Sequence, residues 1–132
     1  MENKNLNILV VEDDSMSRTL ISIHLKKHFD NFEFARNFDE ALLHIKEKPV
    51  DLAFLDMDLK HTDHTGINLI QPLKETRENV KIIMISGFTE QNKLGEEKGA
   101  HASIKKGHIT DGEHSLIQET LKKVGVVSKY KK

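Results

Sequence analysis

Short apolar runs alternate along the chain with longer amphipathic stretches. Runs rich in branched residues and bounded by polar residues are typical of buried β-strands. Such runs occupy residues 8–11, 32–35, 52–55, 80–85 and 102–105. Between them, apolar residues recur at helical spacing. The pattern therefore predicts a strand followed by a helix, repeated five times.

The first helical stretch follows residue 14. Met16, Leu20 and Ile23 recur at i, i+4 and i+7, the spacing of one apolar helix face. We expect these three side chains to be buried against the sheet, and the helix to end near His28.

Two later helices contain residues that disfavour a regular helix. Gly66 opens the third helical stretch, and Pro72 lies within it, so we expect a bend or a late start there. The fourth stretch, residues 90–98, is polar and short and is interrupted by Gly95. Because glycine loses the most backbone freedom in a helix, we expect a weak helix.

The last helix is predicted to open at residues 110–113, which have the Thr-x-x-Glu pattern of a capping box. It would bury Ile117, Leu121 and Val124, and Gly125 would end it. Residues 126–132 are basic and lack a helical stripe, so we expect a disordered tail.

Strands that alternate with helices predict a parallel sheet with helices on both faces, because each crossover is right-handed and must cover the sheet. The chain has 132 residues, enough for one domain with a proper core. We therefore expect a single α/β domain over residues 1–125, followed by the tail at 126–132.

Composition narrows the classes of partner. Twenty basic residues against 21 acidic residues leave a net charge of −1, which gives no general reason to expect a nucleic-acid or membrane partner. There is no cysteine, so a disulfide framework and a thiol nucleophile are excluded. No apolar run has the length of a membrane span or a signal peptide, and we expect a cytoplasmic protein.

Acidic residues lie where two of the predicted strands end. Glu12 and Asp13 follow the first strand, and Asp56 follows the third. If these strands are parallel neighbours, their carboxyl ends share one crevice, the usual ligand site of an open α/β sheet. Three carboxylates repel one another there unless a cation joins them, and a hard divalent ion such as Mg²⁺ prefers oxygen ligands. The sequence therefore predicts a magnesium site.

Further polar residues follow the last two strands: Ser86 with Gly87 after the fourth, and Lys106 after the fifth. Together with Asp56 and the run Ile-Leu-Val-Val-Glu-Asp-Asp-Ser at residues 8–15, they resemble the receiver domain of bacterial two-component response regulators over residues 5–125. The joint spacing of four sites is more specific than any single one. The resemblance implies a flavodoxin-like (βα)₅ fold, a doubly wound five-stranded parallel sheet of order 2-1-3-4-5.

The resemblance also implies roles for these residues. Asp56 would accept a phosphoryl group from a phosphohistidine, while Ser86 and Lys106 would bind the phosphoryl oxygens. If the fifth strand were shifted by one residue, Lys105 would replace Lys106. The carbonyl of Met57 or Asp58 would complete the metal site, and the usual geometry of the family favours Asp58. The implied Mg²⁺ ligands are Glu12, Asp13, Asp56 and the backbone carbonyl of Asp58.

Partners follow from the same resemblance. A sensor histidine kinase or a histidine phosphotransfer protein would donate the phosphoryl group, and a downstream protein would contact the surface formed by residues 90–124. We expect a single-domain response regulator that signals by protein contact. It would be a phosphoacceptor with self-catalysed transfer and dephosphorylation, and not a turnover enzyme.

The chain departs from the family pattern at two positions that concern signalling. Gly107 stands where proline usually follows the lysine, and Ser103 stands where the family commonly has Tyr or Phe. An alternative reading is therefore a pseudo-receiver, an interaction module that works without phosphorylation.

Two enzyme classes are also compatible with part of the pattern. Glu12 with the Asp-Met-Asp sequence at residues 56–58 resembles the metal site of toprim enzymes. The same Asp-Met-Asp after an apolar run resembles haloacid-dehalogenase-like phosphatases, but neither class accounts for Ser86 and Lys106. His61, Asp63 and His64 form a further candidate, a transition-metal cluster, although their spacing is not specific.

Overall fold

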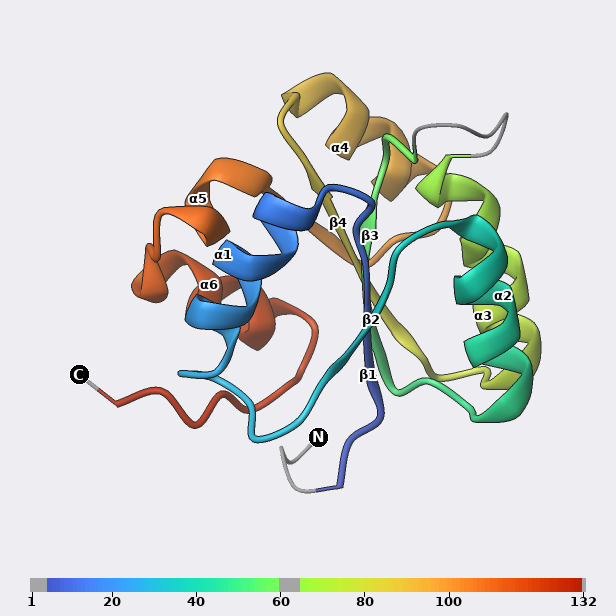
Figure 1. Cartoon of the computed structure of the whole chain (residues 1–132), viewed down its shortest axis with the longest axis horizontal. Helices are drawn as coiled ribbons and strands as arrows, with labels where there is room; N and C mark the ends of the chain where they lie inside the picture. Colours follow the sequence, from blue (N-terminus) through green and yellow to red (C-terminus); the bar gives the residue numbers. More distant parts are fainter. Residues whose placement is uncertain (1–4, 60–64, 132) are drawn as a thin grey trace.

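The computed structural model describes residues 5–59 and 65–131. Within them the strands form one sheet of order β2-β1-β3-β4-β5, in which every neighbouring pair is parallel (Figure 1). This confirms the predicted α/β class and strand order. The strands are β1 (Ile8–Val11), β2 (Glu33–Ala35), β3 (Leu52–Asp56), β4 (Lys81–Ser86) and β5 (Ala102–Lys105).

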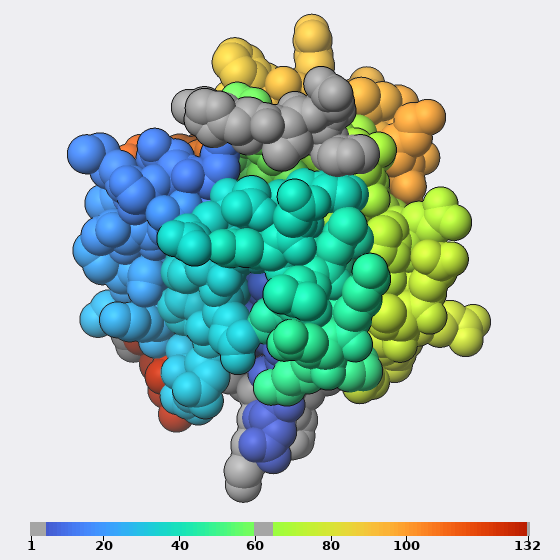
Figure 2. Space-filling view, turned by 45° about the vertical axis from the view of Figure 1, so that its right-hand side comes forward, coloured from blue at the N-terminus to red at the C-terminus, as the bar shows by residue number. Residues whose placement is uncertain are grey.

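Helices cover both faces of the sheet. In Figure 1, α1, α5 and α6 lie on one side of the strands, and α2 and α3 lie on the other. Figure 2 shows α2 at the front, between α1 in blue and α3 in yellow-green. The helices are α1 (Ser15–Leu25), α2 (Phe38–Glu47), the 3₁₀ helix η1 (Gly66–Leu69), α3 (Ile70–Thr76), α4 (Thr89–Glu97), α5 (Lys106–Thr110) and α6 (His114–Lys123).

The sheet separates two hydrophobic cores. Leu9 and Val11 of β1 belong to the core under α2 and α3, whereas Ile8 and Val10 belong to the core under α1 and α6. Successive side chains of a strand point to opposite faces, so one short apolar run supplies both cores. This explains why the strands are apolar throughout instead of alternating with polar residues.

The buried face of α1 differs from the predicted one. Met16 and Ile23 are 72% and 51% exposed, and Leu20 is 36% exposed. Ile21 and Leu25 are buried instead. The helix carries apolar residues on two sides, and packing against the sheet selects the side on which Ile21 and Leu25 contact the core. The prediction that Met16, Leu20 and Ile23 are buried is therefore wrong.

The third helical stretch starts late, as expected. A 3₁₀ turn precedes α3, and Pro72 lies in the first turn of the α-helix, where its missing N–H is tolerated. In α4 the helix continues through Gly95. A Cβ atom there would lie 2.3 Å from Met84 Cγ, so glycine allows close packing of α4 on β4. Gly95 is thus a packing residue and does not interrupt the helix.

The chain after β5 forms a helix that the sequence did not predict. Ile109 of this helix, α5, is completely buried. The hydroxyl of Thr110 donates to the Gly107 carbonyl within the same helix. The predicted capping box therefore does not form, because Thr110 belongs to the preceding helix. Helix α6 begins at His114 and buries Ile117 and Leu121, and Gly125 with φ +77° follows its end.

Residues 126–131 make specific contacts with the rest of the domain, which the expectation of a disordered tail did not include. Val126 is 3% exposed and belongs to the core under α1 and α6. Ser128 Oγ lies 2.6 Å from Nδ1 of the buried His28, and the Tyr130 ring stacks on the rings of His28 and His114 at 5.1 and 4.7 Å. Specific contacts thus outweigh the basic composition that suggested a solvated tail.

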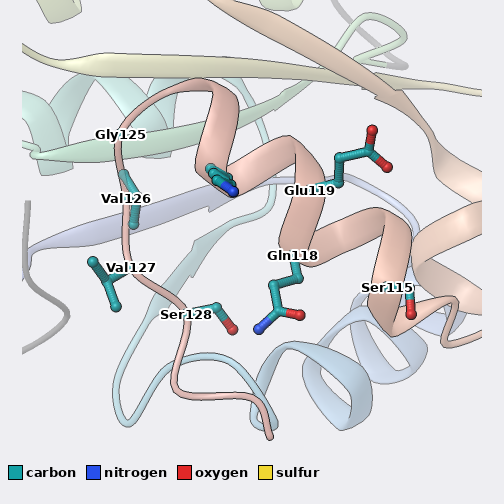
Figure 3. A pocket seen from close by; sticks show the side chains of 8 residues that line it. Ser115, Gln118, Glu119, Gly125, Val126, Val127 and Ser128 are labelled. Atoms are coloured by element: carbon teal, nitrogen blue, oxygen red, sulfur yellow. The ribbon is translucent and has the colours of Figure 1, made fainter. Parts of the chain in front are cut away.

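The same segment borders an open groove along α6. The groove has a volume of about 650 Å³, and all its lining residues come from α6 and the segment after it (Figure 3). Ser115 and Gln118 project from α6, and Val127 and Ser128 line the opposite wall. It lies apart from the acidic residues at the strand ends.

Candidate functional site

The acidic crevice forms where β1 and β3 end side by side. Val11 pairs with Leu55, so Glu12 and Asp56 leave neighbouring strands at nearly the same level. Glu12 is fully buried, Asp56 is 2% exposed and Asp13 is half-buried. One carboxylate oxygen from each of the three residues lies within 4.8 Å of the others. The structure thus brings together the acids that the sequence placed at these strand ends.

Lys106 reaches into this crevice from the start of α5. Its Nζ atom lies 2.8 Å from Glu12 Oε1 and 2.9 Å from Asp56 Oδ2. Lys105, the last residue of β5, is exposed. The lysine next to Asp56 is therefore Lys106, as first expected, and not Lys105.

The charged groups in the crevice shift one another's pKa values. Burial raises the pKa of Glu12 to about 7; the hydrogen bond from Lys106 acts in the opposite direction, and the Asp56 charge adds to the increase. Burial disfavours the charged form of Lys106, but its hydrogen bonds to Glu12 and Asp56 outweigh burial and raise its pKa. A single ammonium thus faces the two buried carboxyl groups of Glu12 and Asp56.

Ser86 lies at the end of β4, the strand next to β3, and is 2% exposed. Its hydroxyl donates to Oε1 of Gln91 in the first turn of α4 and accepts a hydrogen bond from Phe88 N at 3.2 Å. Sequence reasoning missed Gln91. A glutamine early in a helix carries no signal of its own, because it is as common on solvated faces.

The segment after Asp56 turns back toward the Asp56 side chain. Asp58 N donates to Asp56 Oδ1 at 3.1 Å, while the Asp58 side chain is exposed. The Met57 carbonyl accepts a hydrogen bond from Gly66 N at 3.3 Å, so within the described residues the Asp58 carbonyl is the more available metal ligand of the two. A Cβ atom on Gly66 would lie 2.2 Å from the Asp56 carbonyl oxygen, so the close approach requires glycine.

Helix α1 is attached to the end of β1 by polar contacts. Arg18 Nη1 donates to the Glu12 carbonyl at 2.9 Å, and Asp14 N donates to Glu12 Oε2 at 3.2 Å. The Asp14 side chain caps the helix by accepting from Ser17 N at 2.8 Å. Asp14 therefore serves as a helix cap beside the crevice.

Two further sequence expectations concern metals and membranes. The candidate cluster His61, Asp63 and His64 lies outside the described residues. Among the residues that are described, Glu12, Asp13 and Asp56 form a group with the geometry to hold a metal ion. In the same part of the chain, no helix combines the length and the hydropathy needed to cross a membrane.

Known proteins resemble this chain in sequence. It is 33% identical over 82 residues to a putative NtrX-like response regulator of Rickettsia felis, covering 62% of this chain and 17% of the relative. It is 30% identical over 95 residues to sporulation initiation phosphotransferase F of Bacillus subtilis, covering 71% of this chain and 74% of that protein. The chain thus spans about a sixth of the length of the Rickettsia regulators that it matches.

Solved structures share the fold. The receiver domain of NtrX from Brucella abortus superposes with a TM-score of 0.73 at 27% identity, covering 88% of this chain and 98% of the other. A CheY-like receiver domain protein from Methanospirillum hungatei superposes with a TM-score of 0.71 at 26% identity, covering 90% and 95%. The family model of the response regulator receiver domain matches residues 8–111. The chain, with its acids at the ends of β1 and β3, therefore belongs to the response regulator receiver domain family.

Proposed function

We propose that this chain is a response regulator receiver domain that accepts a phosphoryl group on Asp56 and signals by protein contact. The observation that carries the proposal is the contact of Asp56 with Lys106 inside a crevice shared with two further carboxylates. A purely structural ion pair between Asp56 and Lys106 would not need two further acids in the same crevice, because like charges disfavour one another when buried.

The transfer uses the carboxylate of Asp56 as nucleophile. One carboxylate oxygen forms a bond to the phosphorus atom of a phosphohistidine, and the phosphorus–nitrogen bond breaks. The imidazole nitrogen keeps the electron pair of that bond and takes up a proton. Lys106 lies 2.9 Å from Asp56 Oδ2, near enough to pair with the developing phosphoryl charge. Ser86, at the end of the adjacent strand, supplies a hydroxyl donor.

The residues of the crevice fit Mg²⁺. Their carboxylate oxygens converge within 4.8 Å, and oxygen donors suit a hard divalent cation. Asp13, Asp56 and the Asp58 carbonyl would hold the ion, with Glu12 acting through its bound water. When bound, Mg²⁺ supplies positive charge that offsets charge on the phosphoryl oxygens.

The phosphoryl donor is a sensor histidine kinase or a histidine phosphotransfer protein of the cytoplasm. Similarity to a sporulation phosphotransferase supports phosphoryl transfer as the activity. The exposed Met16, Leu20 and Ile23 of α1 provide an apolar surface whose near end is only a few residues beyond Asp13. Exposed apolar patches of this kind are typical of protein contact sites. The surface formed by residues 90–124 would contact the downstream protein.

Labelling with acetyl phosphate tests the proposal. With Mg²⁺, intact-protein mass spectrometry should detect one added phosphoryl group, and Asp56→Asn should abolish it. Asp39→Asn, at an exposed position of α2, is the matched control and should label like the unchanged protein. Absence of labelling in the unchanged protein would overturn the proposal and favour the phosphorylation-independent module. Undiminished labelling of Asp56→Asn would show that another residue is the acceptor.

A further inference from the structure

The proton of the Ser86 hydroxyl is already engaged in this structure. It donates its proton to Gln91 Oε1 and accepts a hydrogen bond from Phe88 N at 3.2 Å. Ser86 is 2% exposed, so solvent does not replace these partners. Gln91 lies in the first turn of α4, five residues beyond Ser86, and is half-buried. The two side chains close a small hydrogen-bonded ring between the end of β4 and the helix.

A serine hydroxyl has one proton to donate. A phosphoryl oxygen on Asp56 carries negative charge and can only accept, so its bond to Ser86 needs that same proton. The bond to Gln91 and the bond to the phosphoryl group therefore exclude each other. The charge-assisted bond is the stronger of the two, which gives the exchange a direction.

We propose that Gln91 is a positioning residue that holds the Ser86 hydroxyl in the unphosphorylated state and must release it before Ser86 can bind the phosphoryl group. This inference rests on the proposed function, because it needs a phosphoryl group at Asp56. It assigns to α4 an autoinhibitory contact that lowers the affinity of the site for the phosphoryl group. Binding of the phosphoryl group must break that contact, so the free energy of the contact links the phosphorylated state of the site to the release of Gln91.

Release of Gln91 also affects how α4 is attached to the sheet. The next residue, Asn92, is buried, and its Nδ2 donates to the carbonyls of Ser86 at 3.5 Å and Ile104 at 3.3 Å. These carbonyls lie at the ends of β4 and β5. At the other end of α4, Glu96 accepts a hydrogen bond from the Ser103 hydroxyl. Loss of the Gln91 bond therefore weakens the first of the contacts that tie α4 to both strands.

Beryllofluoride, which mimics the phosphoryl group on a carboxylate, tests the inference in the Mg²⁺-loaded protein. Calorimetric titration should show about 2- to 10-fold tighter binding by Gln91→Leu, the factor expected for removing one competing hydrogen bond. Gln91→Ala should change in the same direction and serves as a second variant if leucine disturbs folding. Leu94→Gln, the reverse exchange at an exposed position of the same helix, should bind like the unchanged protein.

A double-mutant cycle separates the proposed contact from a general effect on α4. In a Ser86→Ala background, Gln91→Leu should leave the affinity unchanged, because no hydroxyl remains to be held. The side-chain amide resonances of Gln91 should also shift when beryllofluoride binds to the unchanged protein. Tighter binding that persists in Ser86→Ala, or equal affinity of Gln91→Leu and the unchanged protein, would overturn the role of Gln91.

Failure of the proposed function has a different signature. If the unchanged protein neither binds beryllofluoride nor is labelled by acetyl phosphate, phosphoacceptance itself is overturned, and the role of Gln91 is overturned with it. If the unchanged protein binds the mimic and Gln91→Leu has the same affinity, only the role of Gln91 is overturned.

Discussion

Lys106 Nζ lies 2.9 Å from Asp56 Oδ2, although the two residues belong to segments separated by the whole width of β4 in the sheet. The contact forms because Lys106 opens α5 and its long side chain crosses the end of β4 to the crevice. Both carboxylates that it contacts are almost completely buried, whereas the lysine side chain is 23% exposed. Lys106 is thus the cation that balances the buried acids.

Removal of this cation should destabilise the fold. Lys106→Ala leaves Glu12 and Asp56 buried without their partner, and we expect a loss of about 1 to 3 kcal/mol in the free energy of unfolding. Urea unfolding without Mg²⁺, above the pKa of about 7 of Glu12, is the measurement. Lys105→Ala, at the exposed neighbouring position, should stay within about 0.5 kcal/mol of the unchanged protein. Equal losses in both variants would contradict the pairing.

Added Mg²⁺ should reduce the loss in Lys106→Ala. A divalent cation bound by the same carboxylates replaces part of the missing positive charge, and a ligand that binds only the folded state stabilises it. If the stability of Lys106→Ala does not respond to Mg²⁺ while the unchanged protein responds, the metal site itself depends on Lys106.

Gly66 should tolerate no side chain. In Gly66→Ala the new Cβ atom meets the backbone oxygen of Asp56 at 2.2 Å, so the loop or the end of β3 must move. We expect a loss of about 1 to 3 kcal/mol in unfolding free energy and slower labelling by acetyl phosphate. Gly107→Ala is the control, since a Cβ atom there meets nothing within 4 Å and alanine favours the helix. Unchanged stability and labelling in Gly66→Ala would contradict the close approach.

The buried His28 should make stability depend on pH. Burial, with a smaller contribution from His114, lowers its pKa from 6.5 to about 4 in the folded protein. Between about pH 6.5 and pH 4, His28 therefore binds a proton in the unfolded chain but stays neutral in the folded protein. Stability is fully present above that value and falls on acidification toward pH 4, by on the order of 1 to 3 kcal/mol.

Urea unfolding at a series of pH values measures this dependence. Tyr130 is the only tyrosine and the chain has no tryptophan, so intrinsic fluorescence reports the segment stacked on His28. The slope between pH 6.5 and 4 should be smaller in His28→Gln. A slope as steep as that of the unchanged protein would mean that other groups are responsible.

The C-terminal segment should contribute to stability through Val126. Val126→Ala removes two buried carbon atoms from the core under α1 and α6, and we expect a loss of about 1 to 3 kcal/mol. Val127→Ala is a matched control, because Val127 is 56% exposed. Thermal unfolding of both variants is the measurement, and equal stability of the two would indicate a mobile segment.

The sequence by itself determined the five strands, most of the helices and most of the crevice. Buried parallel strands must be apolar along their whole length, so each strand and its polar end can be read locally. The acids Glu12, Asp13 and Asp56 were placed at two strand ends in this way, and the crevice then follows from the strand order. The family resemblance added Ser86 and Lys106, and the structure places Lys106 against the acids.

Only the tertiary structure decided which of several locally equivalent residues are buried or held by specific contacts. The sequence of α1 offers two apolar sides, and contact with the sheet selects Ile21 and Leu25 over Met16, Leu20 and Ile23. Local composition could not distinguish a free basic tail from one held by contacts such as that of Ser128 with His28, because these two residues lie 100 positions apart in the sequence.

The same limit applies to the residues that act through close contact. Gly95 looked like a helix breaker and is a packing residue, because Met84 of β4 occupies the space of its side chain. Gln91 gave no signal in the sequence, yet it accepts a hydrogen bond from the Ser86 hydroxyl. Apolar periodicity indicates which sides of an element can be buried, but a hydrogen bond or a steric contact depends on the distance between two atoms. That distance is set only when the sheet and its helices have packed together.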